Sequence, residues 1–300
     1  MKAQKIKYID RKTNEILIED VPGENYLNFL YYNPFGKLPL HLAVKRKLFS
    51  SLYGKLMSSK GSQKKILYFI KKYNINMSES LKQVSDFSSF NDFFYRKLIP
   101  DARYVNTDKN VVVSPADGKI LAFPDINEIN SFFVKGNKFN LYSFFRDKDL
   151  SDKFKDGSFI TVRLAPVDYH RFHFPYDGYI NESKLINGDY FSVSPIAMRE
   201  NFSVFLENKR EFSILKTGIF GDIALFEIGA TMVGSIYQTY PPNTSVIKGQ
   251  EKGYFAFGGS TCIMLFEKGK IKIDEDILRN TKNMLETKIY MGEKIATLVK

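Results

Sequence analysis

From about Val111 to the C-terminus, short apolar runs alternate with turn residues, and this alternation constrains the fold more than any other feature. Runs rich in β-branched and aromatic residues and bounded by glycine, asparagine or aspartate are typical of strands joined by turns. The expected strands lie at 111–113, 158–164, 212–216, 223–228, 254–257 and 262–266. The predicted fold class is α+β, with a β-rich antiparallel core behind a helical N-terminal portion.

The N-terminal portion is basic and has helical periodicity. No Asp or Glu occurs from Asn25 to Ser78, and apolar residues recur every fourth position around 44–57 and again at 66–73. Such basic amphipathic helices are typical of membrane surfaces, but their apolar faces can equally pack on the protein while the lysines stay solvated. The side chains expected to face a membrane are Lys45, Arg46, Lys47, Lys55, Lys64 and Lys65.

Composition limits the partners and the compartment. The net charge of +11 favours an anionic partner, either a membrane surface or a nucleic acid. The single cysteine, Cys262, allows no intrachain disulfide, fits a reducing compartment and lies in an apolar run typical of a buried core residue. No apolar run approaches the roughly 20 residues of a spanning helix, and no apolar signal core follows the first residues. We therefore expect any membrane contact to be peripheral.

The turn Phe257-Gly258-Gly259-Ser260-Thr261 has the residues that a self-cleaving peptide bond requires. Cleavage needs the Ser260 hydroxyl to attack the carbonyl of Gly259 where the backbone bends sharply. Glycine has no Cβ and tolerates positive φ, so it suits such a bend. Because a Gly-Gly-Ser-Thr string alone is most often an ordinary turn, this interpretation also requires a base for the serine.

Two of the three histidines, His170 and His173, lie in the segment 168–175. Histidine is the usual base for a serine nucleophile, and a carboxylate commonly orients it. Asp117, in the turn 114–118, is the candidate for that carboxylate. A metal-binding pair is disfavoured, since i and i+3 side chains of a strand point to opposite faces and no third ligand lies nearby. We expect no metal.

Together these segments resemble the phosphatidylserine decarboxylases, a family of pyruvoyl-dependent lipid enzymes. The resemblance extends from about residue 85 to the C-terminus, and its Asp-Tyr-His-Arg-x-His and Gly-Ser-Thr elements are specific. Some members have Leu where this chain has Gly258, and many have Thr where it has Tyr95, but the Gly-Ser bond is kept. The matching segments are 90–98, 114–119, 164–175, 208–211, 229–236, 248–249 and 257–261.

The resemblance implies a zymogen that makes its own cofactor. Ser260 would attack the Gly259 carbonyl to give an ester, whose elimination and loss of ammonia leave a covalent pyruvoyl group at position 260. His173 would be the base and Asp117 its orienting partner. The products would be a large chain (1–259) and a small chain (260–300) that remain associated. The decarboxylase core would span 85–300, behind a membrane-facing segment 1–84.

The resemblance also implies the reaction, a lyase step of phospholipid biosynthesis. The amine of phosphatidylserine would form a Schiff base with the pyruvoyl ketone, CO2 would leave, and phosphatidylethanolamine would be released. His170 would handle the proton that returns to the α-carbon. The basic helices would hold the enzyme as a peripheral protein at the cytoplasmic face of the cell membrane, where anionic lipids include the substrate. A homodimer stays an open alternative.

Other functions also stay open. A decarboxylase of a free amino acid or of another aminoacyl lipid would use the same Ser260 chemistry, although the long acid-free stretch favours a lipid. An unprocessed membrane-binding relative would keep the fold without activity, but Asp117, both histidines and the Gly259-Ser260 bond are all present. Nucleic-acid binding is the weakest alternative, because no nucleic-acid motif accompanies the basic residues, and we expect no nucleic-acid partner.

Overall fold

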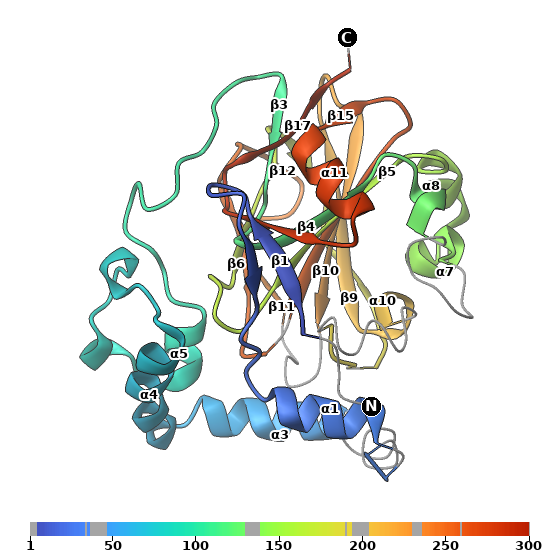
Figure 1. Cartoon of the computed structure of the whole chain (residues 1–300). Helices are drawn as coiled ribbons and strands as arrows, with labels where there is room; N and C mark the ends of the chain where they lie inside the picture. Colours follow the sequence, from blue (N-terminus) through green and yellow to red (C-terminus); the bar gives the residue numbers. More distant parts are fainter. Residues whose placement is uncertain are drawn as a thin grey trace.

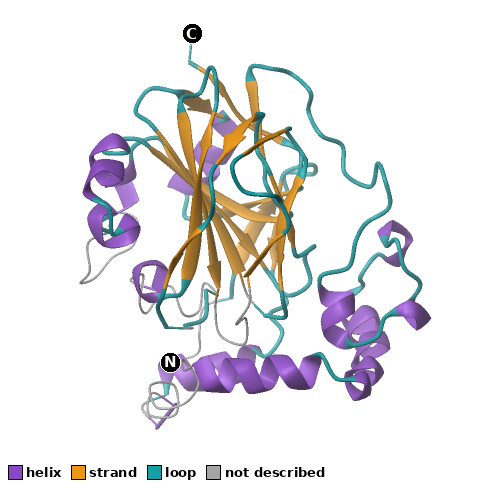
Figure 2. Ribbon diagram, turned by 180° about the vertical axis from the view of Figure 1, so that it is seen from behind, coloured by secondary structure: helices purple, strands orange, loops and turns teal. Residues whose placement is uncertain are grey.

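The computed structural model of the chain describes residues 5–33, 35–36, 47–129, 139–189, 191–193, 204–229, 236–258 and 260–299. Strands gather at the centre of the molecule and helices lie around them (Figures 1 and 2). The strand pairings are antiparallel except for that between β1 and β16, so the fold is β-rich with a mixed main sheet, consistent with the α+β class.

The main sheet of the described residues has 11 strands in the order β12-β7-β9-β10-β14-β5-β4-β16-β1-β2, and β8 also pairs with β9. Strands β14 and β5 are buried along their whole length, because side chains cover both faces of the sheet there. The strands are β1 (Lys7–Asp10), β2 (Ile16–Ile18), β4 (Gly118–Phe123), β5 (Ser158–Leu164), β7 (Gly178–Ile180), β8 (Lys184–Ile186), β9 (Arg210–Lys216), β10 (Asp222–Gly229), β12 (Thr244–Val246), β14 (Ser260–Phe266) and β16 (Glu286–Ile289).

Two three-stranded sheets pack against one face of the main sheet, in the orders β11-β13-β6 and β15-β17-β3. Between the layers lies a core that includes Phe172, Phe255, Cys262 and Met264, so the cysteine is buried as expected. Their strands are β3 (Val111–Val113), β6 (Arg171–His173), β11 (Ile236–Gln238), β13 (Glu251–Phe255), β15 (Ile271–Ile273) and β17 (Lys294–Leu298).

An aromatic cluster covers the opposite face of the main sheet. Phe144 of α7 stacks on Phe226 of β10 with ring centroids 4.1 Å apart, and Phe145 packs edge-on against Phe212 of β9. Elsewhere α11 packs on β4 and β16. The helices around the sheets are α7 (Leu141–Phe145), α8 (Lys148–Lys153), α10 (Val204–Glu207) and α11 (Glu275–Lys282).

The N-terminal helices lie at one end of the sheets, far from the C-terminus (Figure 1). A separate apolar cluster joins Met57, Ile66, Phe90 and Phe93 and contacts Phe257 of the loop after β13. None of the described helices is long and apolar enough to cross a bilayer. These helices are α1 (Glu24–Tyr32), α3 (Lys47–Met57), α4 (Lys64–Tyr73) and α5 (Phe90–Phe94).

The strands at 111–113 and 158–164 have the predicted bounds, as β3 and β5, and the other predicted strands differ from β9, β10, β13 and β14 by at most three residues at either end. The hairpin of β1 and β2 was not predicted. Strand β2 is exposed throughout and β1 is only partly covered. Their sequences, Lys-Tyr-Ile-Asp and Ile-Leu-Ile, do not alternate apolar and polar residues, which is the pattern that signals a half-buried strand. It joins the main sheet through a parallel pairing with β16, which lies nearly the whole chain away in sequence.

Candidate active site

Ser260 is the first residue of β14 and is held between two strands. It pairs with Gly229 at the end of β10 and with Leu164 at the end of β5. The residue is completely buried, and its hydroxyl oxygen has no hydrogen-bond partner among the described residues. A buried hydroxyl without a partner is rare, because burying it without a compensating hydrogen bond costs free energy. The hydroxyl is therefore available for chemistry.

The chain that leads to Ser260 is anchored independently. The N–H of Phe257 donates a hydrogen bond of 2.8 Å to the Asn91 side chain, and the Phe257 ring packs on Phe94 with centroids 4.8 Å apart. Gly258 has a φ of 139°, a backbone conformation that side chains disfavour. Gly259 lies outside the described residues. The segment 256–258 follows β13 of a small sheet and contacts α5, and the next described residue, Ser260, begins β14 between β10 and β5.

His170 lies in the loop before β6, completely buried and with its ring centroid 3.9 Å from that of Phe94. Its Nδ1 is 2.9 Å from the backbone oxygen of Asp168. A carbonyl oxygen can only accept, so Nδ1 carries the proton and Nε2 keeps a free lone pair. Nε2 has no partner among the described residues.

The surroundings of His170 keep it neutral. Burial lowers its pKa to about 4, although the backbone of Asp168 and that of Gly258 act in the opposite direction. The influence of Gly258 also places the imidazole beside the glycine segment. At neutral pH His170 therefore offers an unprotonated nitrogen next to the chain that leads to Ser260.

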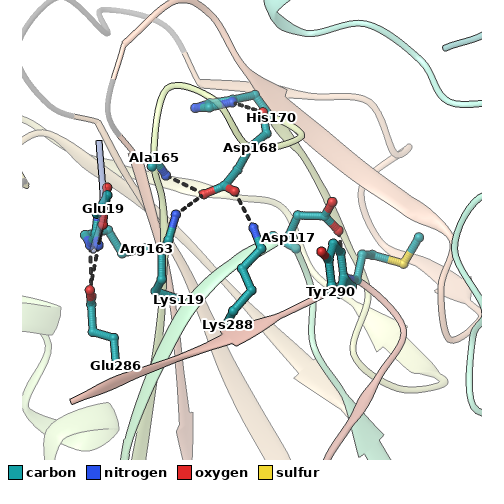
Figure 3. A network of polar contacts seen from close by, with 12 residues as sticks. Glu19, Asp117, Lys119, Arg163, Ala165, Asp168, His170, Glu286, Lys288 and Tyr290 are labelled. Carbon is teal, nitrogen blue, oxygen red and sulfur yellow. Dashed lines mark hydrogen bonds and ion pairs between the residues drawn. The ribbon is translucent and has the colours of Figure 1, made fainter. Parts of the chain in front are cut away.

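The Asp168 carboxylate holds this loop in place (Figure 3). It accepts hydrogen bonds from the backbone N–H of Ala165 at 2.8 Å, from Lys119 of β4 at 3.1 Å, and from Lys288 of β16. Burial raises its pKa, but the charges of the two lysines outweigh burial and hold the pKa well below the usual range. Asp168 is therefore a fixed anion that orients the carbonyl to which His170 donates.

Asp168 and its lysines belong to a larger group of charges, here called the charge cluster, made of three cations and three carboxylates. Arg163 of β5 bonds both Glu19 and Glu286, and the charges of Lys119 and Asp168 act on the pKa of Glu19. The opposite charges balance, as a buried group of ions requires. The members are Glu19, Lys119, Arg163, Asp168, Glu286 and Lys288.

His173 lies on β6, where its ring stacks on Tyr169 at 5.8 Å between centroids. Its backbone N–H donates to Pro115 O in the turn that carries Asp117, at 2.7 Å. Burial lowers its pKa to about 4, with the charges of Glu251 and Asp117 opposing the shift. Its Nδ1 has no partner within the described part of the chain. His173 is thus another neutral imidazole.

The Asp117 carboxylate is bonded elsewhere. Both oxygens accept from Arg103, at 2.7–3.0 Å, and one accepts from the backbone N–H of Met291 at 2.9 Å. Among the described contacts, Asp117 makes no hydrogen bond to His173. The structure therefore brings the turn of Asp117 and the strand of His173 together, without joining their side chains. Catalytic hydrogen bonds are often long before substrate binds, so this arrangement is compatible with the predicted roles of Asp117 and His173, which stay predictions.

Comparison with known proteins gives the family. A sequence profile for phosphatidylserine decarboxylase matches residues 90–297. The chain belongs to the phosphatidylserine decarboxylase family. It is 60% identical over 294 residues to the phosphatidylserine decarboxylase proenzyme of Fusobacterium nucleatum subsp. nucleatum, covering 98% of each chain. It is 50% identical to the proenzyme of Clostridium novyi over 97% of this chain and 99% of that protein. The resemblance of the sequence motifs to this family is thereby confirmed.

A cavity of about 280 Å3 lies beside Gly258 in this decarboxylase-family chain. Its walls are mostly apolar and come from the N-terminal helices and the end of β5, while Glu19 and Arg163 of the charge cluster supply polar atoms. The apolar and aromatic lining residues include Tyr26, Leu27, Tyr53, Phe69, Val193 and Phe257. The N-terminal helices thus help to enclose the space next to the Gly-Ser segment.

Of the residues expected to face a membrane, Lys55 of α3 and Lys64 and Lys65 of α4 are exposed. Lys45 and Arg46 lie outside the described residues, as does the side chain of Lys47. The lysines that fix Asp168 were not predicted from the sequence. A lysine inside the apolar run of 118–123 was the available signal, because a fully buried lysine requires a partner.

Proposed function

We propose that this member of the family cleaves its own backbone between Gly259 and Ser260 and then decarboxylates phosphatidylserine to phosphatidylethanolamine. The observation that carries the proposal is the buried Ser260 hydroxyl without a partner, directly after the glycine segment, in a chain 60% identical to a phosphatidylserine decarboxylase proenzyme. The two buried neutral histidines, of which His170 lies beside this segment, are the proposed proton acceptors.

In the proposed self-cleavage, the Ser260 oxygen attacks the Gly259 carbonyl carbon while His173 accepts the hydroxyl proton. The peptide C–N bond breaks as the ester C–O bond forms. Removal of the Ser260 α-proton then expels Gly259 as a carboxylate, and water replaces the remaining nitrogen, which leaves as ammonia. Asp117 is the proposed orienting partner of His173; burial lowers the pKa of that histidine, and the negative charge of Asp117 opposes the shift, in the direction that this role requires.

The position of Ser260 fits a pyruvoyl group. No described residue uses this hydroxyl, and the β10 and β5 backbones hold residue 260 in a buried site. When present, the group supplies a ketone that binds the substrate amine covalently and takes up the electrons released with CO2. Gly229 and Leu164, which pair with Ser260 in the sheet, would hold the group.

His170 is the proposed proton carrier of the mature reaction. Its Nδ1 proton is engaged by the Asp168 carbonyl, so Nε2 is the atom that can take up and return a proton. A neutral imidazole at working pH suits that task, because it can accept without first losing a proton. The adjacent cavity would take the glycerol and the start of the acyl chains.

The large chain (1–259) and the small chain (260–300) are proposed to stay together after cleavage. Strand β14 lies between β10 and β5, β16 lies between β1 and β4, and β17 lies between β15 and β3. Two ion pairs, Lys288–Asp168 and Arg163–Glu286, would link the small chain to the large chain. Separation would require breaking the sheets. We retain 1–84 and 85–300 as the proposed division, although β1 and β2 join the main sheet.

The N-terminal helices are proposed to hold the protein peripherally at the cytoplasmic face of the membrane. Leu52, Leu56, Leu67 and Tyr68 are more than half exposed on α3 and α4, alongside the exposed lysines. Each lysine near an anionic surface contributes about 1 kcal/mol. The side chains proposed to face lipid are Lys45, Arg46, Lys47, Lys55, Lys64 and Lys65.

The proposed substrate is tested by measuring CO2 release from carboxyl-labelled phosphatidylserine in vesicles and from free serine. We expect wild-type protein to release CO2 from the lipid and the Ser260→Ala variant to release none. Release from free serine without release from the lipid would contradict the proposed substrate and favour an amino acid decarboxylase.

A further inference from the structure

Arg96 is a buried cation to which no described residue is paired. It is 8% exposed, and its Nε is enclosed without a hydrogen-bond partner among the described residues. No ion pair or side-chain hydrogen bond to it occurs within the described part of the chain; its guanidinium only lies over the Phe93 ring, at 5.1 Å. Burial lowers its pKa accordingly. An unpaired buried charge costs free energy and therefore requires an explanation.

The other buried arginines of the described ranges all have partners. Arg163 pairs with two glutamates, Arg171 pairs with Glu251, and Arg210 donates to four backbone carbonyls. Asp117 is close enough to raise the pKa of Arg96, but its oxygens are already bonded by Arg103 and by a backbone N–H. The Arg96 guanidinium is therefore available to an anion from outside the chain.

Arg96 follows α5 directly, and this segment packs on the active-site loop. The Phe94 ring lies 3.9 Å from the His170 ring, and the Tyr95 carbonyl accepts a hydrogen bond of 2.9 Å from Arg171 Nε. Burial is the main cause of the low pKa of His170, and the charge of Arg96 lowers it further. Arg96 thus lies beside the histidine proposed to move the proton.

We propose that Arg96 binds the phosphodiester of the phospholipid substrate and so selects the lipid over free serine. This inference rests on the function proposed above. Phosphatidylserine brings two anionic groups to the site, its carboxylate and its phosphodiester. A cation bound to the carboxylate would stabilise the charge that must leave, and so would favour the ground state over the transition state. The phosphodiester stays anionic throughout, and the planar guanidinium fork matches its oxygens.

Binding can be measured without turnover in the Ser260→Ala variant, which cannot form the pyruvoyl group. The probe is glycerophosphoserine, titrated by calorimetry. Arg96→Met in this background should weaken binding about 10- to 100-fold, the range for hydrogen bonds to charged groups. The matched control is Lys97→Met, which removes an exposed charge from the next residue and should leave the affinity unchanged.

A purely structural role is tested by stability. Arg96→Met leaves no described residue without an ion-pair partner. The melting temperature of this variant should therefore equal or exceed that of the Ser260→Ala parent, as is common when a functional charge is removed. A drop of several degrees together with unchanged glycerophosphoserine affinity would overturn the proposal.

Steady-state kinetics with substrates that have or lack a phosphodiester show whether Arg96 acts on this group or on the rest of the substrate. In the self-cleaved enzyme, Arg96→Met should raise KM for short-chain phosphatidylserine with little change in kcat, and leave kcat/KM for a phosphate-free serine ester unchanged. Equal losses on both substrates, or blocked self-cleavage, would contradict phosphodiester binding. Arg96-dependent binding of glycerophosphoserine by a wild-type protein that releases no CO2 would instead support the site and overturn the reaction.

Discussion

The Lys288–Asp168 ion pair permits a quantitative test of how the active-site loop is held. Lys288 supplies one of three donors to a carboxylate whose side chain is only 3% exposed. Removing one partner of a buried pair costs about 3–5 kcal/mol. Lys119 and the Ala165 N–H remain, so we expect Lys288→Met to lower the free energy of unfolding by about 3 kcal/mol, near the lower limit. At about 2.1 cal/mol/K per residue, that corresponds to roughly 5 °C in melting temperature for a chain of 300 residues.

The measurement belongs in the uncleaved Ser260→Ala background, where one chain unfolds and mass action between two chains does not enter. Urea unfolding followed by circular dichroism is suitable, because the chain has no tryptophan. The matched control is Lys294→Met. Lys294 pairs with Asp274 at 3.1 Å, but its side chain is 43% exposed, so the loss should stay below about 1 kcal/mol. Equal, small losses for both variants would refute the account of a buried pair that fixes Asp168.

Three further predictions concern the histidines and the lysines. Burial lowers the pKa of His170 and His173 to about 4, whereas the pKa in the unfolded chain is about 6.5. The histidines' contribution to the free energy of unfolding is therefore complete above pH 6.5 and is lost as the pH falls towards 4. Urea titrations should show a loss of up to about 1.4 kcal/mol per pH unit for each histidine. His173→Ala should block self-cleavage, whereas His170→Ala should cleave but release little CO2, as gel analysis and CO2 assays would show. Replacing Lys55, Lys64 and Lys65 by Gln should weaken binding to phosphatidylserine vesicles by about 100-fold at low salt.

Each of these predictions has a contrary outcome. Stability that is equal at pH 7 and pH 5 would contradict neutral buried histidines. An uncut but folded His170→Ala protein would exchange the proposed histidine roles. Lys148, Lys155 and Lys268, which are exposed on other parts of the molecule, form the control set for the membrane lysines, and an equal effect of both sets would indicate non-specific charge attraction.

Local patterns were enough to predict much of the core. The strand at 158–164 has the expected bounds because both its composition and its flanking turns are informative within one short window. The turn before Ser260 was predicted from the glycines, and the positive φ of Gly258 agrees with that reasoning. By contrast, the β1–β2 hairpin is exposed and joins the sheet through β16, and no local pattern encodes that long-range pairing.

The electrostatic part of the site was not predictable in the same way. Asp168 was visible only as part of a motif, whereas its partners lie 49 and 120 residues away along the chain. That no described residue pairs with Arg96 likewise depends on Arg103 donating its hydrogen bonds to Asp117. The sequence therefore predicts residues with recognisable chemistry, and the folded chain was needed to find those that would orient them or compensate their charges.

The central claim, that the chain converts Ser260 into its own cofactor, is tested most directly by the intact mass of the purified wild-type protein under denaturing conditions. We predict two chains, 1–259 and 260–300, with the smaller one lighter by one ammonia than a peptide that begins with serine. Ser260→Ala should give one unbroken chain. A single 300-residue chain from the wild-type protein, or cleavage that persists in Ser260→Ala, would contradict the account.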